Sequence, residues 1–196
     1  MQNTLTILLA TARRVYIENG FRGLSVESVG MRAGVPLNEA LALTPSPLAL
    51  FRRSVSVKLE RFLDAAAIAV GGRDIQATLE IMLFECGRLA YDSDLRNIGA
   101  RAVAEQEQYP EVASGFYEES IDRLPIALDL WLSHLRRSDL IALEDPKSAA
   151  WMLVGMMTAE LRLVAAGGLQ AEIANDDSML RARQCASLFL RGCLKK

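Results

Sequence analysis

The sequence has few of the residues that usually form catalytic or metal sites. Among its 196 residues there are three cysteines and one histidine. Cys86, Cys185 and Cys193 show neither CxxC spacing nor an even count, which disfavours a zinc site or a disulfide framework and indicates reduced thiols. His134 has no serine or acidic partner at a catalytic spacing, and near a helix end it can simply interact with the helix dipole. We therefore expect no catalytic residues, no metal and no cofactor, so the chain should not be an enzyme.

The sequence also lacks a long apolar run. A membrane-spanning helix needs roughly 18 or more consecutive apolar residues. The longest candidate, residues 149–168, is interrupted by Glu160 and Arg162. Near the N-terminus, Arg13 and Arg14 follow the apolar stretch instead of preceding it, and no small-residue cleavage site comes after them, which disfavours a signal peptide. We expect a cytoplasmic protein without a membrane partner.

Charge is scarce overall and unevenly distributed. The net charge is −2, which gives no general attraction to nucleic acid. The first 55 residues, however, contain six arginines and three glutamates, a net charge of +3, so the remainder carries −5. A mildly basic front on an acidic body allows one end of the protein to face nucleic acid without proving that it does.

The sequence is rich in apolar residues at three- and four-residue spacing, and almost none alternate. With 51% hydrophobic and 23% charged residues, this pattern predicts an all-α protein with a sizeable core. Pro125 should bend one of its long helices, and Ser93 should cap another. We predict three short helices and about six longer ones, at about 4–19, 26–32, 38–43, 47–70, 74–91, 93–107, 111–137, 146–166 and 177–193.

The ends of the first helices carry specific capping signals. Gly20 and Gly34 are suited to end helices, because glycine adopts the left-handed conformation of a C-cap. Ser25 is a good N-cap, since its hydroxyl can accept from free backbone amides. Ser46 followed by Pro47 indicates an N-cap and the first residue of the next helix.

These signals occur in a recognisable order. The run ILLATARRVYIENGFRGLSVESVGMRAGV resembles the N-terminal module of TetR-type transcriptional regulators. In that family a first helix ends in a Gly-Phe pair, here Gly20-Phe21. A Ser/Thr-Val/Ile cap follows, here Ser25-Val26, and an Arg-Ala-Gly-Val turn, here residues 32–35, leads into the recognition helix. The segment RAVAEQEQYPEVASGFYEESIDRL is similar to the ligand and dimerisation domain of some members.

The resemblance implies an architecture and a function. Residues 1–46 would form a helix-turn-helix domain, and residues 47–196 an effector-binding and dimerisation domain. The protein would act as a homodimer on double-stranded operator DNA, and an effector would change the spacing of its two reading heads. The positions expected to face DNA are Arg22, Ser25, Val26, Arg32, Pro36, Leu37, Asn38, Glu39 and Leu41.

The recognition helix departs from the family pattern. Members usually place Ser-Lys-Gly-Thr-Leu/Ile-Tyr after Ala-Gly-Val, and this chain has PLNEAL instead. The lysine and tyrosine that contact phosphates in the family are replaced by Leu37 and Leu41. Only Asn38 and Glu39 can form hydrogen bonds with base edges, Asn38 with adenine and Glu39 with cytosine. Two hypotheses remain: a repressor with an unusual set of DNA contacts, or a degenerate family member that has lost DNA binding and acts through protein partners or a ligand.

Apolar helix faces in the later part of the chain give candidates for an effector pocket and an interface. Methionine and aromatic side chains suit an adaptable pocket for an apolar small molecule, although ordinary core packing is the simpler explanation for each single residue. The pocket candidates are Met82, Cys86, Leu89, Phe116, Leu128, Trp131, Met152 and Met156. Small and apolar residues on the last two helices suit a symmetric dimer contact. The dimer candidates are Gly155, Ala159, Leu180, Ala186, Leu190 and Cys193.

Overall fold

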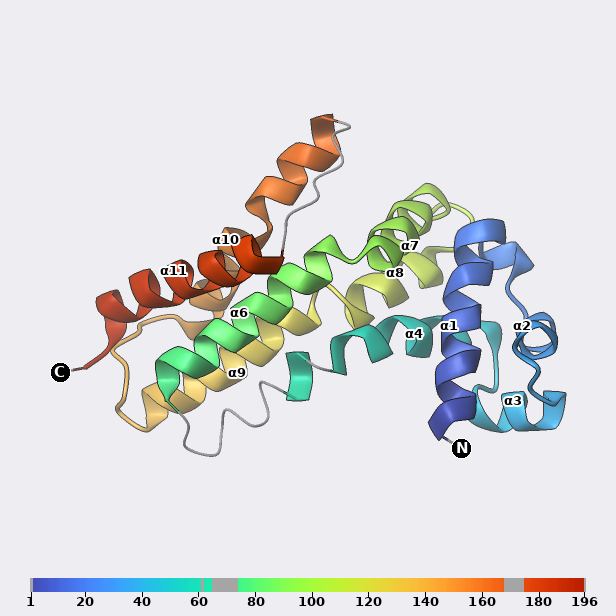
Figure 1. Ribbon diagram of the computed structural model, residues 1–196, viewed down its shortest axis with the longest axis horizontal. Helices are drawn as coiled ribbons and strands as arrows, with labels where there is room; N and C mark the ends of the chain where they lie inside the picture. Colours follow the sequence, from blue (N-terminus) through green and yellow to red (C-terminus); the bar gives the residue numbers. More distant parts are fainter. Residues whose placement is uncertain (1, 61, 65–73, 168–174, 196) are drawn as a thin grey trace. The chain divides into compact units, whose positions relative to one another are not determined.

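The computed structural model describes the backbone of residues 2–60, 62–64, 74–167 and 175–195. In this part of the chain the only β-structure is an isolated bridge between Ile141 and Leu194. The expected all-α class is therefore confirmed. The described elements, shown in Figure 1, are α1 (Gln2–Asn19), η1 (Phe21–Gly23), α2 (Val26–Ala33), α3 (Leu37–Leu43), α4 (Pro47–Ser56), η2 (Val57–Leu59), α6 (Ile75–Tyr91), α7 (Ser93–Ala104), α8 (Pro110–Glu119), α9 (Arg123–Arg137), α10 (Pro146–Gly167) and α11 (Asn175–Cys193).

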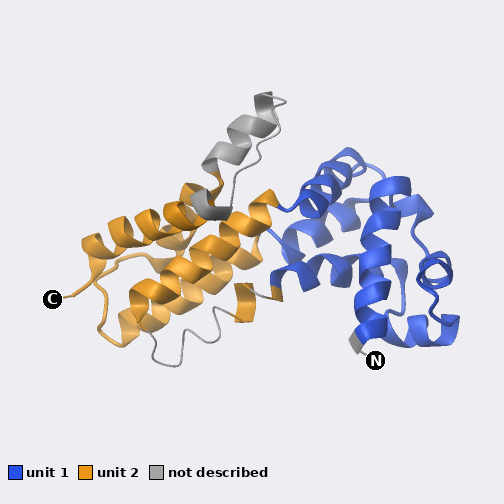
Figure 2. Cartoon of the chain, viewed as in Figure 1, with its two compact units in different colours: residues 1–59, 92–121 blue, residues 60–91, 122–196 orange. Residues whose placement is uncertain are grey.

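The chain divides into two compact units, coloured separately in Figure 2. Unit 1 consists of residues 1–59 and 92–121, and unit 2 of residues 60–91 and 122–196. Helices α7 and α8 therefore pack with the N-terminal helices, although they follow α6 in the chain. The boundary expected after residue 46 separates a DNA-binding role from an effector-binding and dimerisation role, and it stays a prediction.

In unit 1, helix α1 is central. It packs against α2, α4 and α7, and α8 packs against α4 and α7. The rings of Tyr16 on α1 and Phe51 on α4 lie 4.7 Å apart, between centroids, and both side chains are fully buried. Apolar residues at helical spacing on α1 form this core: Leu8, Leu9, Ala12 and Val15.

In unit 2, α6 packs against both α10 and α11, and α9 packs against α10. Burying apolar faces between neighbouring helices is the main source of stability in such a bundle. Its largest fully buried side chains include Leu79, Met82, Leu83 and Trp131.

The fourth helix is shorter than expected, because α4 ends at Ser56 and a 3-10 turn follows. The carbonyl of Ser54, which a continuing helix would use, accepts a hydrogen bond from the Arg13 guanidinium at 2.9 Å. The Ser54 hydroxyl donates to the carbonyl of Phe51 at 2.7 Å, and such local bonds compete with regular helix structure. The rest of the expected helix, residues 65–70, lies outside the described residues.

The single helix expected over residues 111–137 is two helices, α8 and α9. The chain leaves the helical conformation at Ser120, whose φ is −129° and ψ is −79°. The prediction that Pro125 bends one continuous helix is wrong, because Pro125 lies in the first turn of α9. The first turn tolerates proline, since its amides need no intrahelical acceptor.

Asp92 anchors the start of α7. Its carboxylate accepts a hydrogen bond from the amide of Leu95 at 3.0 Å, so Asp92 is the N-cap, and the expected cap Ser93 is already helical. The ammonium group of Lys58 donates to the same carboxylate at 2.9 Å and lies 3.1 Å from Asp94. These ion pairs connect the end of the η2 turn to α7 within unit 1.

Candidate functional site

Helices α2 and α3 form a helix-turn-helix whose turn is fixed by small residues. Gly34 has a φ of 67°, a left-handed conformation that glycine adopts without strain. Gly30 lies at the closest approach of the two helices, since a Cβ there would be 3.1 Å from the carbonyl oxygen of Val35 and 3.4 Å from the Cβ of Ala40. The amide of Val35 also donates to the carbonyl of Gly30 at 2.9 Å. The angle between α2 and α3 is therefore set by the backbone.

A reciprocal capping box starts α2. The Ser25 hydroxyl oxygen accepts from the amide of Ser28 at 3.0 Å, and the Ser28 hydroxyl oxygen accepts from the amide of Ser25 at 3.4 Å. Both expected caps, Ser25 and Gly34, are confirmed. Ser25 is exposed and Val26 is buried, so of this pair only Ser25 presents its side chain to solvent.

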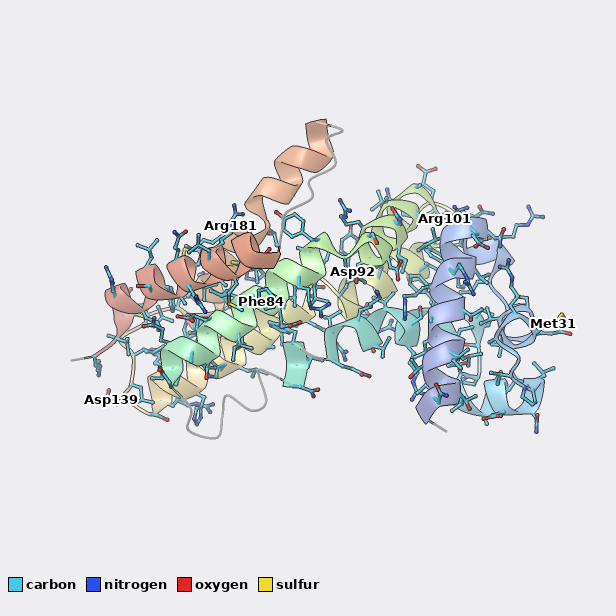
Figure 3. The ribbon with its side chains drawn as sticks, viewed as in Figure 1. Met31, Phe84, Asp92, Arg101, Asp139 and Arg181 are labelled. Atoms are coloured by element: carbon cyan, nitrogen blue, oxygen red, sulfur yellow. The ribbon has the colours of Figure 1, made fainter. Side chains whose placement is uncertain are left out.

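Arg101 of α7 and Glu105, the residue that caps the C-terminus of α7, bind the end of α1 and the residue that follows its C-terminal turn. The Glu105 carboxylate accepts a hydrogen bond from the amide of Phe21 at 3.1 Å, and Arg101 donates to the carbonyl of Ile17 at 2.8 Å. Arg101 and Glu105 also form an ion pair of 3.2 Å; Figure 3 labels Arg101. Gly20 has a φ of 69°, and a Cβ at this position would overlap the Glu105 carboxylate. Sequence analysis did not identify Arg101 or Glu105, because no local pattern relates them to a turn more than 80 residues away.

The outward side of α3 is apolar around a single amide. Ala40 and Thr44 are buried, at 0% and 1% exposure, while Leu37 and Leu41 are 44% and 43% exposed. Asn38 is also exposed, and so are Pro36 and Ala42. We call Leu37, Asn38, Leu41 and Ala42 the α3 outer face; their spacing places them along one side of the helix. Glu39 is partly buried.

Two of the six N-terminal arginines form ion pairs with carboxylates of unit 1. The side chain of Arg13 is 13% exposed and lies 3.6 Å from the Asp94 carboxylate. Burial lowers the pKa of the Arg13 guanidinium, and the charge of Asp94 opposes this shift. Arg52 pairs with Glu118 at 2.6 Å and with Glu119 at 3.0 Å, and the hydrogen bonds that it donates to both glutamates raise its pKa. In this arrangement neither arginine is free to neutralise a phosphate.

The other four arginines are more accessible. Arg14 and Arg22 are exposed and have no carboxylate partner among the described residues. Arg32 forms an ion pair of 2.9 Å with Glu18 in which both side chains are about half exposed. Arg53 is exposed and donates to the carbonyl that ends α3 at 2.9 Å. Exposed pairs of this kind contribute little to stability and exchange readily for other partners.

The effector candidates do not form one cluster. Phe116 belongs to unit 1, where its ring would be 2.8 Å from a Cβ placed on Gly99. Met152 and Met156 on α10 are 60% and 40% exposed, so they are not part of the unit 2 core. The remaining five candidates are buried in unit 2: Met82, Cys86, Leu89, Leu128 and Trp131. The indole N–H of Trp131 is buried and has no acceptor among the described residues.

The dimer candidates also divide into two groups. Gly155 is exposed, and a Cβ there would meet nothing within 4 Å. Leu180 is 55% exposed, whereas the side chain of Ala159 lies outside the described residues. The other three candidates are buried on α11, which packs against α6: Ala186, Leu190 and Cys193.

Two exposed apolar residues of these helices, Trp151 and Leu188, were not among the candidates expected from the sequence. On α10, Trp151 and Met152 are 46% and 60% exposed, and with Gly155 and Met156 they form what we call the α10 stripe. On α11, Leu188 is 66% exposed. Both helices carry apolar residues on more than one side, so the sequence pattern does not indicate which side faces the core.

A helix-turn-helix in an N-terminal segment of net charge +3 (residues 1–55), followed by a helical second unit, is typical of helical DNA-binding regulators. Residues 77–192 match the family described as the AefR-like transcriptional repressor, C-terminal domain. Because this match covers more than half of the chain, the protein belongs to the TetR family of transcriptional regulators. This is a family of regulators and not of enzymes.

Solved structures with the same fold are similar over nearly the whole chain. A protein from Mesorhizobium loti named for the TetR family is 17% identical, with 99% of this chain and 98% of that chain covered and a TM-score of 0.75. The flavonoid-responsive regulator FrrA is 18% identical, with 100% of both chains covered and a TM-score of 0.68. The fatty acid degradation regulator FadR from Bacillus halodurans is 17% identical, with 96% and 95% covered and a TM-score of 0.63. No curated protein matches the chain. None of the described helices is long and apolar enough to cross a membrane.

Proposed function

We propose that the protein is a ligand-responsive transcriptional repressor that binds operator DNA as a cytoplasmic homodimer. The observation that carries this proposal is the intact helix-turn-helix. Gly30, Gly34 and the Ser25 capping box are all present, and α3 presents an exposed side. A chain that no longer used this motif would have no need of a turn that tolerates so few substitutions.

Phosphate contacts would come from outside α3. Arg14, Arg22, Arg32 and Arg53 are exposed cations. The Ser25 hydroxyl uses an oxygen lone pair in the capping box, which leaves its hydrogen to donate to a phosphate. Phosphate contacts need only charge and reach, so they can compensate for the lysine and tyrosine missing from α3.

The α10 stripe is the proposed dimer interface. A tryptophan and two methionines at 40–60% exposure are unfavourable in water, and an exposed glycine between them permits close helix approach. Leu180 and Leu188 on α11 extend the apolar surface of unit 2. A two-fold contact through these helices would give the dimer two helix-turn-helix motifs, and half-sites for such pairs lie one helical turn of DNA, about 34–36 Å, apart.

The effector would bind among the buried residues of unit 2. Leucine, methionine and tryptophan side chains favour an apolar or aromatic molecule. The unpaired indole N–H of Trp131 favours one that also carries a hydrogen-bond acceptor, because an unsatisfied buried donor is costly. Two similar structures are named for flavonoids and fatty acid degradation, and a molecule with apolar and acceptor groups agrees with both names.

A DNA titration tests this proposal. Fluorescence anisotropy of the full-length protein with the duplex upstream of its own gene, at low and moderate salt, should show saturable binding. Arg22→Ala should weaken it and reduce the magnitude of the salt slope by roughly 0.9 for each lost phosphate contact, or roughly 1.8 per dimer. Arg52→Ala is the matched control, since Arg52 is already paired with Glu118 and Glu119 and should leave the slope unchanged.

The alternative is a degenerate regulator that has lost DNA binding. The exposed leucines of the α3 outer face favour it, because such side chains suit a protein surface. Absence of binding even at low salt would support this alternative and contradict the repressor proposal.

A further inference from the structure

The chemistry of the α3 outer face restricts which bases it can recognise. Leu37, Leu41 and Ala42 offer only hydrocarbon, and Asn38 offers one amide group. No lysine or arginine occurs from Ala33 through Phe51. The face therefore lacks the cationic donors that most often bind the O6 and N7 atoms of guanine in the major groove.

The same groups complement an A·T base pair. An asparagine amide can form two hydrogen bonds with N6 and N7 of adenine. Thymine is distinguished in the major groove by its C5-methyl group, which attracts apolar side chains. Leu37 and Leu41 are each a little over 40% exposed and lie on the same side of α3 as Asn38, so a side chain suited to adenine lies beside two side chains suited to thymine methyls.

Neighbouring groups favour DNA over a protein as the partner of this face. Its apolar surface is small, and it is interrupted by the exposed amide of Asn38. Unit 1 also exposes Arg14 and Arg22 without carboxylate partners among the described residues. An apolar protein contact would leave the amide of Asn38 without a partner, whereas a base edge satisfies it.

We propose that the α3 outer face recognises A·T-rich half-sites through the C5-methyl groups of thymine, with Leu37 and Leu41 contacting the methyls and Asn38 binding adenine. This inference rests on the proposed DNA-binding function. It specifies that apolar contacts, in place of charged ones, provide the sequence specificity.

Thymine-to-deoxyuridine replacement tests the proposal, because it removes one methyl group and keeps every base-pairing atom. Sites are first selected from a randomised duplex library with the full-length protein, and then resynthesised with deoxyuridine at each thymine of the enriched half-sites. Burial of one methyl is equivalent to roughly a fourfold change in affinity, so one methyl in each half-site should weaken binding by roughly fifteenfold. The same replacement in the flanking sequence should have no effect.

Variants assign the methyl contacts to α3. In Leu37→Ala and Leu41→Ala proteins, deoxyuridine replacement should cost less than twofold, because the contact has already been lost. Met31→Ala is the matched control: Met31 is 77% exposed on α2, and Figure 3 shows its side chain pointing away from the ribbon. This variant should keep the full sensitivity to deoxyuridine. Circular dichroism melting curves that match the parent protein would exclude misfolding as the cause.

Two other results would overturn the proposal in different ways. Selection of G·C-defined sites, or of specific sites insensitive to deoxyuridine, would contradict methyl recognition and leave the DNA-binding function intact. Selection of no sequence at all would contradict both proposals and favour a protein partner for the α3 outer face.

Discussion

Two of the apolar surfaces that the described residues expose, the α10 stripe and the α3 outer face, differ in what surrounds them. The α10 stripe combines a tryptophan with two methionines around an exposed glycine on a 22-residue helix. The α3 outer face combines two leucines and an alanine with an amide on a 7-residue helix. Large adaptable side chains on a long helix are suited to another protein surface. A small apolar face built around a hydrogen-bonding group is suited to a base edge.

Exposure of apolar residues therefore does not by itself determine whether a surface binds a protein or DNA. The two surfaces have similar exposed fractions, with Leu37 at 44% and Met156 at 40%. They differ in size and in the polar groups beside them. A charge added to the α10 stripe should therefore affect dimerisation, and a charge added to the α3 outer face should affect DNA binding.

The largest effect is expected from a charge in the α10 stripe. In a symmetric dimer of the Met152→Glu variant, each subunit would bury one glutamate carboxylate in the interface. Loss of two apolar contacts costs roughly 3–6 kcal/mol, which weakens dimerisation at least about 100-fold. Light scattering should show a monomer at micromolar concentration. Met31→Glu, on the exposed side of α2, should remain dimeric, and a dimeric Met152→Glu protein would argue against this interface.

An intermediate effect is expected from a cation on the α3 outer face. Leu37→Lys restores the residue type that the family places here, so it should raise affinity for unrelated duplex DNA on the order of tenfold at low salt. The salt slope should steepen by roughly 0.9 per added contact in each subunit. Leu130→Lys adds the same charge at a residue of α9 that is 65% exposed, and it should change neither quantity. Equal effects of the two variants would indicate attraction without docking of α3.

The smallest effect is expected on stability. Leu41→Ala should change the free energy of unfolding by less than about 1 kcal/mol, because the residue is 43% exposed and lies outside the core. Leu50→Ala, at a fully buried position of α4, should cost roughly 2–5 kcal/mol. Urea denaturation monitored by circular dichroism measures both. A large loss for Leu41→Ala would assign this leucine to the core and away from a binding surface.

Much of the fold could be predicted from the sequence because local signals determine helix ends. Ser25, Gly34 and the Ser46-Pro47 pair each act within one helical turn, and each lies where expected. The end of α4 could not be predicted in this way. It depends on Arg13, a residue 41 positions away whose guanidinium bonds to the carbonyl of Ser54.

The candidate sites were less predictable, because helical periodicity gives the faces of a helix but not their surroundings. Met152 and Met156 have the composition of a pocket, but they are exposed in the single chain. Arg13 and Arg52 have the charge of phosphate ligands, but carboxylates of α7 and α8 bind them. For both arginines the deciding contact comes from a distant part of the sequence.

The tight turn around Gly30 has a consequence for how such proteins diversify. The close packing that it requires is met on the inward side, by Gly30, the carbonyl of Val35 and the Cβ of Ala40. The four side chains of the α3 outer face take no part in this close packing, so they can be exchanged while the backbone of the motif stays the same. New operator preferences could therefore arise, or be engineered, by substituting Leu37, Asn38, Leu41 and Ala42 while the turn between α2 and α3 stays the same.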